Sequence, residues 1–346
     1  MNKLKCNALL ILALLISLSG IAKEEFKREI NKEFNVNENT TFDISSKFGD
    51  ISIENTDEAK MSIRVVITAR ASDEEDAKKI FDKIQIGIKE EGNKISAETV
   101  VHADKMKNIQ IDYFIKMPSY IASTISNKFG SVLINSLTRA SSITVAYGNL
   151  RAKKLLFDNK NEQGKVKLSY ASGCVIDECN WLNVDVKYSD LEIGRGKALV
   201  FESKNSNIEI DDVMALIVKS KYDNYEVGSA QNAVINAKFG NYEIGNIVKK
   251  LAIELQYGNM VVGNVVEGFD LIKINNKYAD VDVKIDEGQS YKLTALVEYA
   301  DIDFPDGENI NTHRDNSSLK VDGFVGDKTT DSEVIVVSKY GGVDLD

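Results

Sequence analysis

The chain has 346 residues, of which 43 are Lys or Arg and 53 are Asp or Glu, with 43% hydrophobic residues, 22 Gly and only 2 Pro. This composition excludes a disordered polar tract, a collagen-like chain and a small disulfide scaffold, because enough apolar side chains are present to build a core. The formal net charge is −10 and no basic cluster stands out. Nucleic acid and anionic lipid are therefore not expected as partners, since phosphate groups are bound by fields of Lys and Arg.

The chain begins with the features of an export signal. A short basic segment precedes an apolar run over residues 7–16, which is too short to span a bilayer comfortably, and Ser19-Gly20-Ile21-Ala22 supplies small residues before a cut after Ala22. We predict a signal peptide over residues 1–22, with an uncleaved anchor as the alternative. The exported product would reside in the periplasm, on the cell surface or outside the cell, with no transmembrane segment after signal cleavage.

Export would leave two cysteines, Cys174 and Cys179, five residues apart. An exported protein can form disulfides, so a bond between these two is one reading. The other reading is a pair of small buried thiols, because strand geometry can aim the two side chains apart. Neither cysteine has further Cys or His residues at the spacing of a zinc site.

A repeated segment runs through most of the chain, as in Ala237-Lys238-Phe239-Gly240-Asn241 and Ser46-Lys47-Phe48-Gly49-Asp50. Each copy centres on one anchor position, which is aromatic in eleven copies and Asn in the twelfth. From Phe129 to Tyr299 most anchors are separated by 17 to 21 residues. The anchor residues are Phe48, Phe129, Tyr147, Tyr170, Tyr188, Asn205, Tyr222, Phe239, Tyr257, Tyr278, Tyr299 and Tyr340.

Each copy predicts a strand, a corner and a second strand. Apolar or small residues alternate at positions −4 and −2 before the anchor, which is the period of a half-buried strand. Two small or turn-forming residues follow the anchor, and we assign to them the positive φ angles of a tight corner. Apolar residues resume at +3 and +5, and in several copies another stands at +8, at a second corner. The pattern predicts an all-β chain in which residues 121–346 form a single-stranded parallel β-solenoid, also called a β-helix, of coils stacked in sequence order.

Two stretches depart from this period. Residues 23–120 contain the first copy and then strand-like runs, and we predict a small α+β or sandwich-like capping region with one helix at about 72–84. Ser72 would be the N-cap of that helix and Glu75 would close a capping box. Residues 305–332 are rich in Asp, Asn and Gly and are predicted to form a polar loop before the last copy. The strand-like runs in the capping region cover residues 61–67, 84–88, 95–101 and 109–117.

Residues that could carry chemistry are few. The two histidines, His102 and His313, have no partner at metal spacing and no nucleophile motif beside them. The acidic stretch 301–308 faintly resembles a calcium loop, but its glycine is misplaced and Thr312 stands where a bidentate Glu is needed. We therefore predict no catalytic residue, no metal site and no cofactor.

Two charged columns follow from the repeat. Lysine recurs at position −1 and Glu or Asp at position +4. We interpret these columns as a solvated surface whose opposite charges offset each other, with a patterned face that grips a polymer or a cation as the alternative. The −1 residues are Lys47, Lys128, Lys187, Lys204, Lys221, Lys238, Lys277 and Lys339, and the +4 residues are Glu192, Glu209, Glu226, Glu243, Asp282, Asp303 and Asp344.

The repeats, the export signal and the segment Tyr113-Phe114-Ile115-Lys116-Met117-Pro118 together resemble the bacterial putative-adhesin family of β-strand-repeat proteins. This family is also described as a domain of unknown function or an autotransporter-adhesin-like head. The resemblance covers roughly residues 35 to 346. It implies a β-solenoid envelope or secreted protein typical of Gram-negative cells, and it supplies no catalytic residues.

From the repeat and the signal peptide we predict an exported, non-enzymatic adhesin or cell-envelope interaction scaffold, whose envelope, glycan or protein partner is unknown. One rival is a polysaccharide-acting lyase or hydrolase, because parallel β-helices also carry such enzymes, with carboxylate or calcium sites along one face. The other is a passive periplasmic structural protein.

Overall fold

The computed structural model describes residues 23–102, 108–157, 163–286, 288–305 and 309–345. The predicted signal peptide over residues 1–22 lies outside this part of the chain. The described residues form 23 strands and one helix, so the fold is all-β, and the strands are hydrogen-bonded into one 23-stranded sheet. No helix in these ranges is long and apolar enough to cross a membrane.

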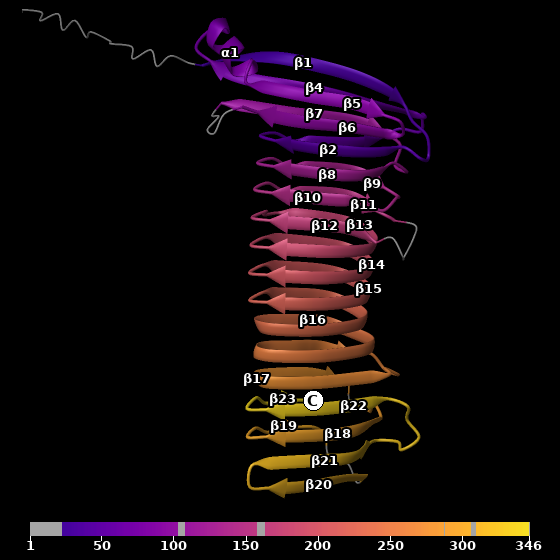
Figure 1. The fold of residues 1–346 in the computed structure, drawn as a ribbon. Coiled ribbons are helices and arrows are strands. Elements are labelled where there is room, and N and C mark those ends of the chain that lie inside the picture. Colours follow the sequence, from indigo (N-terminus) through magenta and orange to yellow (C-terminus); the bar gives the residue numbers. More distant parts are fainter. Residues whose placement is uncertain (1–22, 103–107, 158–162, 287, 306–308, 346) are drawn as a thin grey trace, which may run out of the picture.

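The elements stack along one axis, with a wider cap at one end (Figure 1). The cap contains β1 (Glu24–Asn35), β2 (Thr41–Lys47), β3 (Ile51–Asn55), β4 (Lys60–Ala71), α1 (Glu74–Phe81), β5 (Ile84–Glu91), β6 (Lys94–Val101) and β7 (Ile109–Met117). The stack continues with β8 (Ala122–Lys128), β9 (Val132–Leu137), β10 (Ser142–Ala146), β11 (Leu150–Leu155), β12 (Gly164–Ser169), β13 (Cys174–Lys187), β14 (Asp190–Lys204), β15 (Asn207–Lys221), β16 (Asn224–Val265) and β17 (Leu271–Ile285). The far end is formed by β18 (Tyr291–Glu298), β19 (Ile302–Asp303), β20 (Asn309–Asp315), β21 (Ser318–Val325), β22 (Glu333–Lys339) and β23 (Val343–Asp344).

Successive turns of the chain pair in parallel and in register. Leu191 lies opposite Ile208 and Ile208 lies opposite Tyr225, so β14, β15 and β16 advance by 17 residues per turn. The preceding turns follow the same scheme with two short strands each, since β8, β10 and β12 pair in parallel along one side and β9, β11 and β13 along the other.

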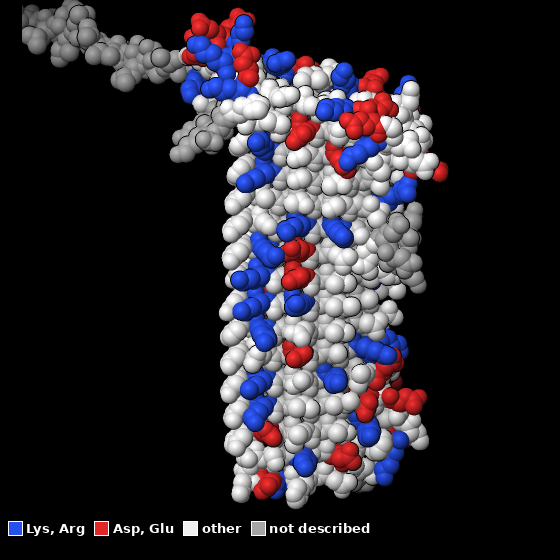
Figure 2. All heavy atoms as spheres, viewed as in Figure 1, with Lys and Arg blue, Asp and Glu red and all other residues white. Residues whose placement is uncertain are grey.

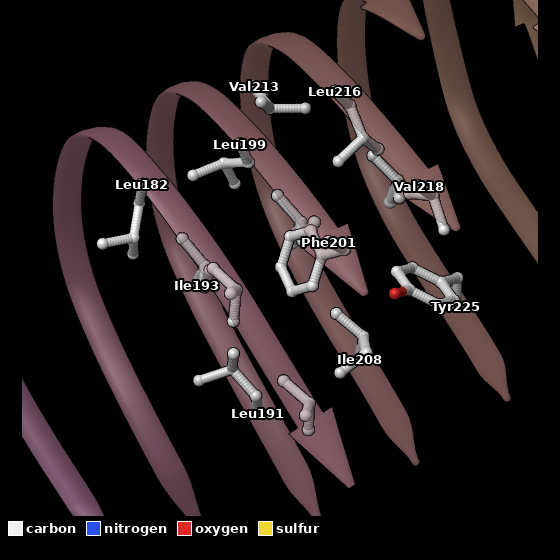
Figure 3. Packing of buried hydrophobic residues seen from close by; sticks show 14 of the residues in the cluster. Leu182, Leu191, Ile193, Leu199, Phe201, Ile208, Val213, Leu216, Val218 and Tyr225 are labelled. Carbon is white, nitrogen blue, oxygen red and sulfur yellow. The ribbon is translucent and has the colours of Figure 1, made fainter. Parts of the chain in front are cut away.

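Apolar side chains fill the space inside each turn (Figure 3). In one turn, Leu191 and Ile193 point inward from the strand after the anchor, and Leu199 and Phe201 from the strand before the next anchor; all four are at most 2% exposed. The predicted inward positions at +3 and +5 are thereby confirmed, and the +8 residues Val213, Ala230 and Ile247 are buried as well. Fully burying a side chain of this size contributes about 1.5–3 kcal/mol, so the repeated core is the main source of stability.

The sharp corner of each turn lies at the anchor residue itself. All twelve anchors have φ between 52° and 66°. The prediction that the two following residues supply this conformation is therefore wrong, because the left-handed backbone is taken by the aromatic residue. That conformation costs an ordinary side chain about 1–2 kcal/mol and is tolerated best by Asn among non-glycine residues.

The cap covers the first turn with antiparallel strands. β4 pairs with β1 on one side and β7 on the other, and β5 pairs with β6. β2 lies between β6 and β8, so the Phe48 copy stacks on the Phe129 copy despite the 81 residues between them. β1 forms the outer edge of the cap, and its charged residues protect that edge from pairing with another chain.

The helix α1 begins one residue later than predicted. Its N-cap is Asp73, whose carboxylate accepts a hydrogen bond from the Asp76 backbone N–H at 2.8 Å. The Ser72 hydroxyl instead donates to the Asp76 side chain at 2.6 Å. Ser and Asp are both favourable N-cap residues, so the sequence alone does not distinguish Ser72 from Asp73 as the N-cap.

The far end departs from sequence order. The segment predicted as a polar loop contains β20 and β21, which form an antiparallel hairpin, and β21 pairs with β18 to cover the end of the stack. The chain then turns back, and β22 inserts between β17 and β18 with parallel pairing on both sides. The prediction that every copy stacks on its predecessor is therefore wrong for the last one, whose anchor Tyr340 lies between Tyr278 and Tyr299.

Candidate functional site

The anchor residues form a column of stacked rings along one edge of the molecule. Neighbouring ring centroids lie 4.8–5.4 Å apart with interplanar angles of at most 21°. We call this set the aromatic column. In stacking order it consists of Phe48, Phe129, Tyr147, Tyr170 and Tyr188, then Asn205 in place of a ring, and then Tyr222, Phe239, Tyr257, Tyr278, Tyr340 and Tyr299.

The aromatic column is exposed although its members are large. Ten of its eleven rings are 39–59% exposed. From Phe48 to Tyr188 and from Tyr222 to Tyr299 each ring stacks on the next, so these two parts of the column present mainly ring edges to solvent. Aromatic stacking contributes about 0.5–1.5 kcal/mol per pair, which offsets the strain of the left-handed backbone beneath each ring.

A column of lysines runs beside the rings, and Figure 2 shows basic side chains aligned along the stack. Lys187, Lys204 and Lys221 lie directly opposite one another on neighbouring strands. Lysine Nζ atoms also lie near ring centroids, as for Lys128 at 4.9 Å from Phe129. Further such contacts are made by Lys221 at 4.9 Å from Tyr222, Lys277 at 5.3 Å from Tyr278 and Lys339 at 5.4 Å from Tyr340.

The lysine and acidic columns do not neutralise each other by contact. Among the described residues, the −1 lysines in ion pairs are Lys187, with Asp185 at 3.1 Å, and Lys339, with Glu298 at 2.7 Å. Neither partner belongs to the +4 column. Like charges stacked on neighbouring strands are unfavourable, so the lysine column forms a basic strip on an acidic protein and favours an anionic ligand.

Four of the seven +4 acids line a separate groove of about 800 Å³. An exposed row of glutamates lines this groove, and a ladder of Asn side chains runs beside the row. In the ladder each side-chain amide donates a hydrogen bond to the side chain one turn earlier, at 2.8–3.3 Å. The ladder links five successive turns along the groove wall. The glutamates are Glu192, Glu209, Glu226 and Glu243, and the ladder is Asp190, Asn207, Asn224, Asn241 and Asn259.

A buried polar cluster lies inside the stack next to Asn205. The fully buried Asp223 accepts hydrogen bonds from the backbone N–H groups of Ser206 at 2.8 Å and Lys221 at 3.0 Å. The Ser206 N–H bonds Oδ1, whereas the Lys221 N–H shares Oδ2 with the hydroxyls of Ser203 and Ser220, which donate to it at 2.8 Å and 2.5 Å. These serines in turn hydrogen-bond the buried phenols of Tyr225 and Tyr242, each at 2.7 Å.

Sequence reasoning missed this cluster, although its signal was present. Ser203 and Ser220 stand at position −2, where other copies carry residues such as Val186, and tyrosines stand at +3 where others carry Leu or Ile. Polar residues at two inward positions of the same turns indicate a shared hydrogen-bond network, because each buried polar group needs a partner.

Burial raises the pKa of Tyr242 to about 12, against the lowering effect of its hydrogen bond to Ser220, and raises the pKa of Tyr113 to about 12 in the same way. Both phenols ionise near 10 when unfolded. Their contribution to stability is therefore complete below about pH 10 and is lost as the pH rises towards about 12. We expect the urea midpoint to fall over this range, and to fall less steeply in Tyr242→Phe; an unchanged midpoint would contradict the burial.

The structure places the remaining predicted residues as follows. Cys174 and Cys179 are free, buried thiols, and burial raises the pKa of the Cys179 thiol to about 12. His102 and His313 are exposed and lie apart, in the cap and in β20. Of the faint calcium loop, Asp301 pairs with Arg314 at 3.4 Å, and residues 306–308 lie outside the described ranges. Within those ranges no group of three or more His, Cys, Asp or Glu is placed to hold a metal ion.

No protein-family model matches the chain, and a search of curated proteins finds no match. Among solved structures, the chain is similar to a putative cell adhesion protein from Clostridium sporogenes, at 11% identity and a TM-score of 0.21, over 93% of this chain and 99% of that one. It is also similar to a putative adhesin from Parabacteroides distasonis, at 12% identity and a TM-score of 0.33, over 92% and 97% of the two chains. A third is a putative adhesin from Bacteroides fragilis, at 11% identity and a TM-score of 0.27, over 92% and 97%.

Proposed function

We propose that this chain is an exported, non-enzymatic interaction scaffold of the cell envelope, an adhesin in the broad sense, built on a single-stranded parallel β-solenoid. The parallel pairing of turn upon turn at a constant 17-residue advance supports the solenoid. Both ends are capped by antiparallel strands whose outer edges are polar. Such edges disfavour end-to-end pairing with a second copy of the chain.

The observation that carries the proposal is the pairing of the aromatic column with the lysine column. Together they present ring edges at a repeat of about 5 Å and, on the four consecutive turns from Lys187 to Lys238, one ammonium group per turn. A surface that repeats in one direction suits a partner that also repeats, and the charge of the lysines selects an anionic one. An acidic envelope or host glycan lying along the column fits both requirements, because several weak contacts add up along a polymer.

The test is a pair of charge reversals in the column. In Lys128→Glu with Lys277→Glu, we expect binding of the full chain to an acidic polysaccharide to weaken by about tenfold or more. The matched control is Lys273→Glu with Lys320→Glu, which makes the same change in net charge at exposed lysines outside the column.

We expect the control to bind within about twofold of the unmodified chain, and all binding to weaken as salt is raised. Equal losses in both double variants would show that only overall charge matters and would contradict the proposal. An absence of binding to every acidic polysaccharide and envelope fraction would instead favour a passive structural protein.

The rival function, a polysaccharide-acting enzyme, would use the acidic groove. Glu209 and Glu226 stand on neighbouring turns at its bed, and pairs of carboxylates about 5–5.5 Å apart are used by retaining glycosidases. We expect no release of reducing ends or unsaturated sugars from acidic polysaccharides by the full chain. Release that disappears in both Glu209→Gln and Glu226→Gln would replace the scaffold proposal by this rival.

A further inference from the structure

The aromatic column is interrupted at Asn205. This residue differs from the other anchors in its side chain and not in its backbone conformation. The backbone of Asn205 follows the other anchors, with φ at 52° and its N–H donating to the Lys221 carbonyl oxygen at 3.2 Å, as the Tyr188 N–H donates to Lys204. A short, exposed amide thus stands where eleven other turns carry a ring.

The gap has the height of one aromatic ring. Rings on adjacent turns lie about 5 Å apart throughout the column, as between Tyr170 and Tyr188 at 5.0 Å and between Tyr222 and Phe239 at 5.0 Å. Tyr188 and Tyr222 are two turns apart, which corresponds to about 10 Å at the usual strand spacing. A planar ring placed between them would lie about 5 Å from each, in the geometry that the column already uses.

Lysine stands at position −1 on the gap's turn and on both neighbouring turns. Lys204 precedes Asn205 and lies opposite Lys187 and Lys221 on the neighbouring turns. Among the residues that the structure describes, Lys204 and Lys221 take part in no ion pair. Two ammonium groups without a counter-ion beside an open stacking position favour an aromatic ring that carries a negative charge.

The frame of the gap is held from inside by the buried polar cluster. Asp223 accepts hydrogen bonds from Ser206, directly after the gap residue, and from Lys221, directly before the ring of Tyr222. The only fully buried carboxylate in the described ranges therefore fixes the backbone of the gap's own turn and of the Tyr222 turn. A preorganised frame lowers the cost of ordering the site when a ligand binds.

We propose that the gap at Asn205 is a binding site for one planar aromatic ring bearing a carboxylate or similar acidic group, stacked between Tyr188 and Tyr222. This inference rests on the proposed function in one respect, namely that the aromatic column is a binding surface. The ligand of the site is either a free aromatic acid or an aromatic side chain beside acidic residues in a partner protein, and both present the same chemistry.

The test uses 2-naphthoate with the full chain, followed by ligand-observed NMR. The unmodified chain should bind one naphthoate, and should bind cyclohexanecarboxylate, which is not planar, and the cation 2-naphthylmethylammonium at least about tenfold more weakly. Asn205→Tyr completes the column and should remove the site, whereas Asn205→Ala should keep it. Equal binding of naphthoate to the unmodified chain and to Asn205→Tyr would overturn the proposal.

A gain of binding gives an independent check. Phe239→Asn opens a second gap between Tyr222 and Tyr257, beside Lys221 and Lys238, and should raise the stoichiometry from one naphthoate to two. Tyr170→Asn opens a gap whose own −1 residue is Ser169, so its naphthoate binding should be weaker. A stoichiometry that stays at one in Phe239→Asn would contradict the stacking geometry, even if Asn205→Tyr binds less.

Two peptides separate the sources of the ligand. Tighter binding of acetyl-Glu-Trp-Glu-amide than of naphthoate, with none of acetyl-Glu-Ala-Glu-amide, would indicate a side chain of a partner protein. Tighter binding of naphthoate would indicate a free aromatic acid. These measurements do not involve the polysaccharide, and Lys128 and Lys277 lie away from the gap. The test of the gap and the test of the scaffold are therefore independent, and either proposal can be contradicted while the other holds.

Discussion

Replacing Asp223 by Ala is expected to lower the free energy of unfolding by about 3–5 kcal/mol, the largest effect of any single polar residue in the stack. The carboxylate satisfies two backbone N–H groups and two hydroxyls in a place that water does not reach. Without it, the N–H groups of Ser206 and Lys221 lose their partner while they stay buried. Chemical denaturation followed by circular dichroism measures the loss.

Two variants make this measurement specific. Asp223→Asn keeps the shape and one acceptor oxygen, so its loss should be smaller than that of Asp223→Ala. Asp190→Ala removes an exposed carboxylate that accepts a hydrogen bond from the side chain of Asn207, and should cost about 0.5 kcal/mol or less. Equal, small losses in Asp223→Ala and Asp190→Ala would show that the cluster is not closed to water.

The second large effect is expected where the last copy inserts. Val336 in β22 is 1% exposed and faces Ile274 of β17 and Ala295 of β18. Val336→Asp would bury a carboxylate without a partner between two turns, which costs several kcal/mol and should release β22 from the stack. Limited proteolysis should then cut the segment between β21 and β22.

The neighbouring residue provides the control. Val337 is 44% exposed on the outer face of the same strand. Val337→Asp should therefore change the unfolding midpoint and the proteolysis pattern little. If the two variants behave alike, β22 does not lie between β17 and β18, and the order of Tyr278, Tyr340 and Tyr299 in the aromatic column is wrong.

The sequence predicts the repeated part of the fold because the alternation of apolar and polar residues in each copy shows which side chains point inward. The alternation around Tyr188, with Val184 and Val186 before it and Leu191 and Ile193 after it, fixes which side chains point inward, and all four are buried. This alternation does not show which copies lie on neighbouring turns. The segment Ser338-Lys339-Tyr340 fits equally well at any turn, and only the hairpin made by β20 and β21 carries it back to a position before Tyr299.

The first strand could not be predicted for a different reason. In β1 only Phe26, Ile30 and Phe34 are partly buried, and a spacing of four residues is the period of a helix. An edge strand of the cap needs few buried residues, so tertiary pairing with β4 decides its structure.

The candidate site was partly visible in the sequence. The anchor residues were found from their spacing and assigned a structural role, and equivalent positions in stacked turns must lie in line. Their left-handed backbone was not predictable from residue type, since aromatic residues avoid it, and with an ordinary extended backbone the rings would have pointed elsewhere. The spacing identifies Asn205 as the twelfth anchor, and the structure shows that its short side chain leaves a gap between Tyr188 and Tyr222.

The proposed function requires that the chain acts outside the cytoplasm. Fractionation of the native cells, with protease added to intact cells and then to cells whose outer membrane has been opened, tests it most directly when the chain is followed by antibody. The account predicts a protein that is shortened at its start and absent from the cytosol. Cleavage on intact cells would indicate a surface adhesin, and protection until the outer membrane is opened would indicate a periplasmic scaffold. Full-length protein confined to the cytosolic fraction would contradict the account.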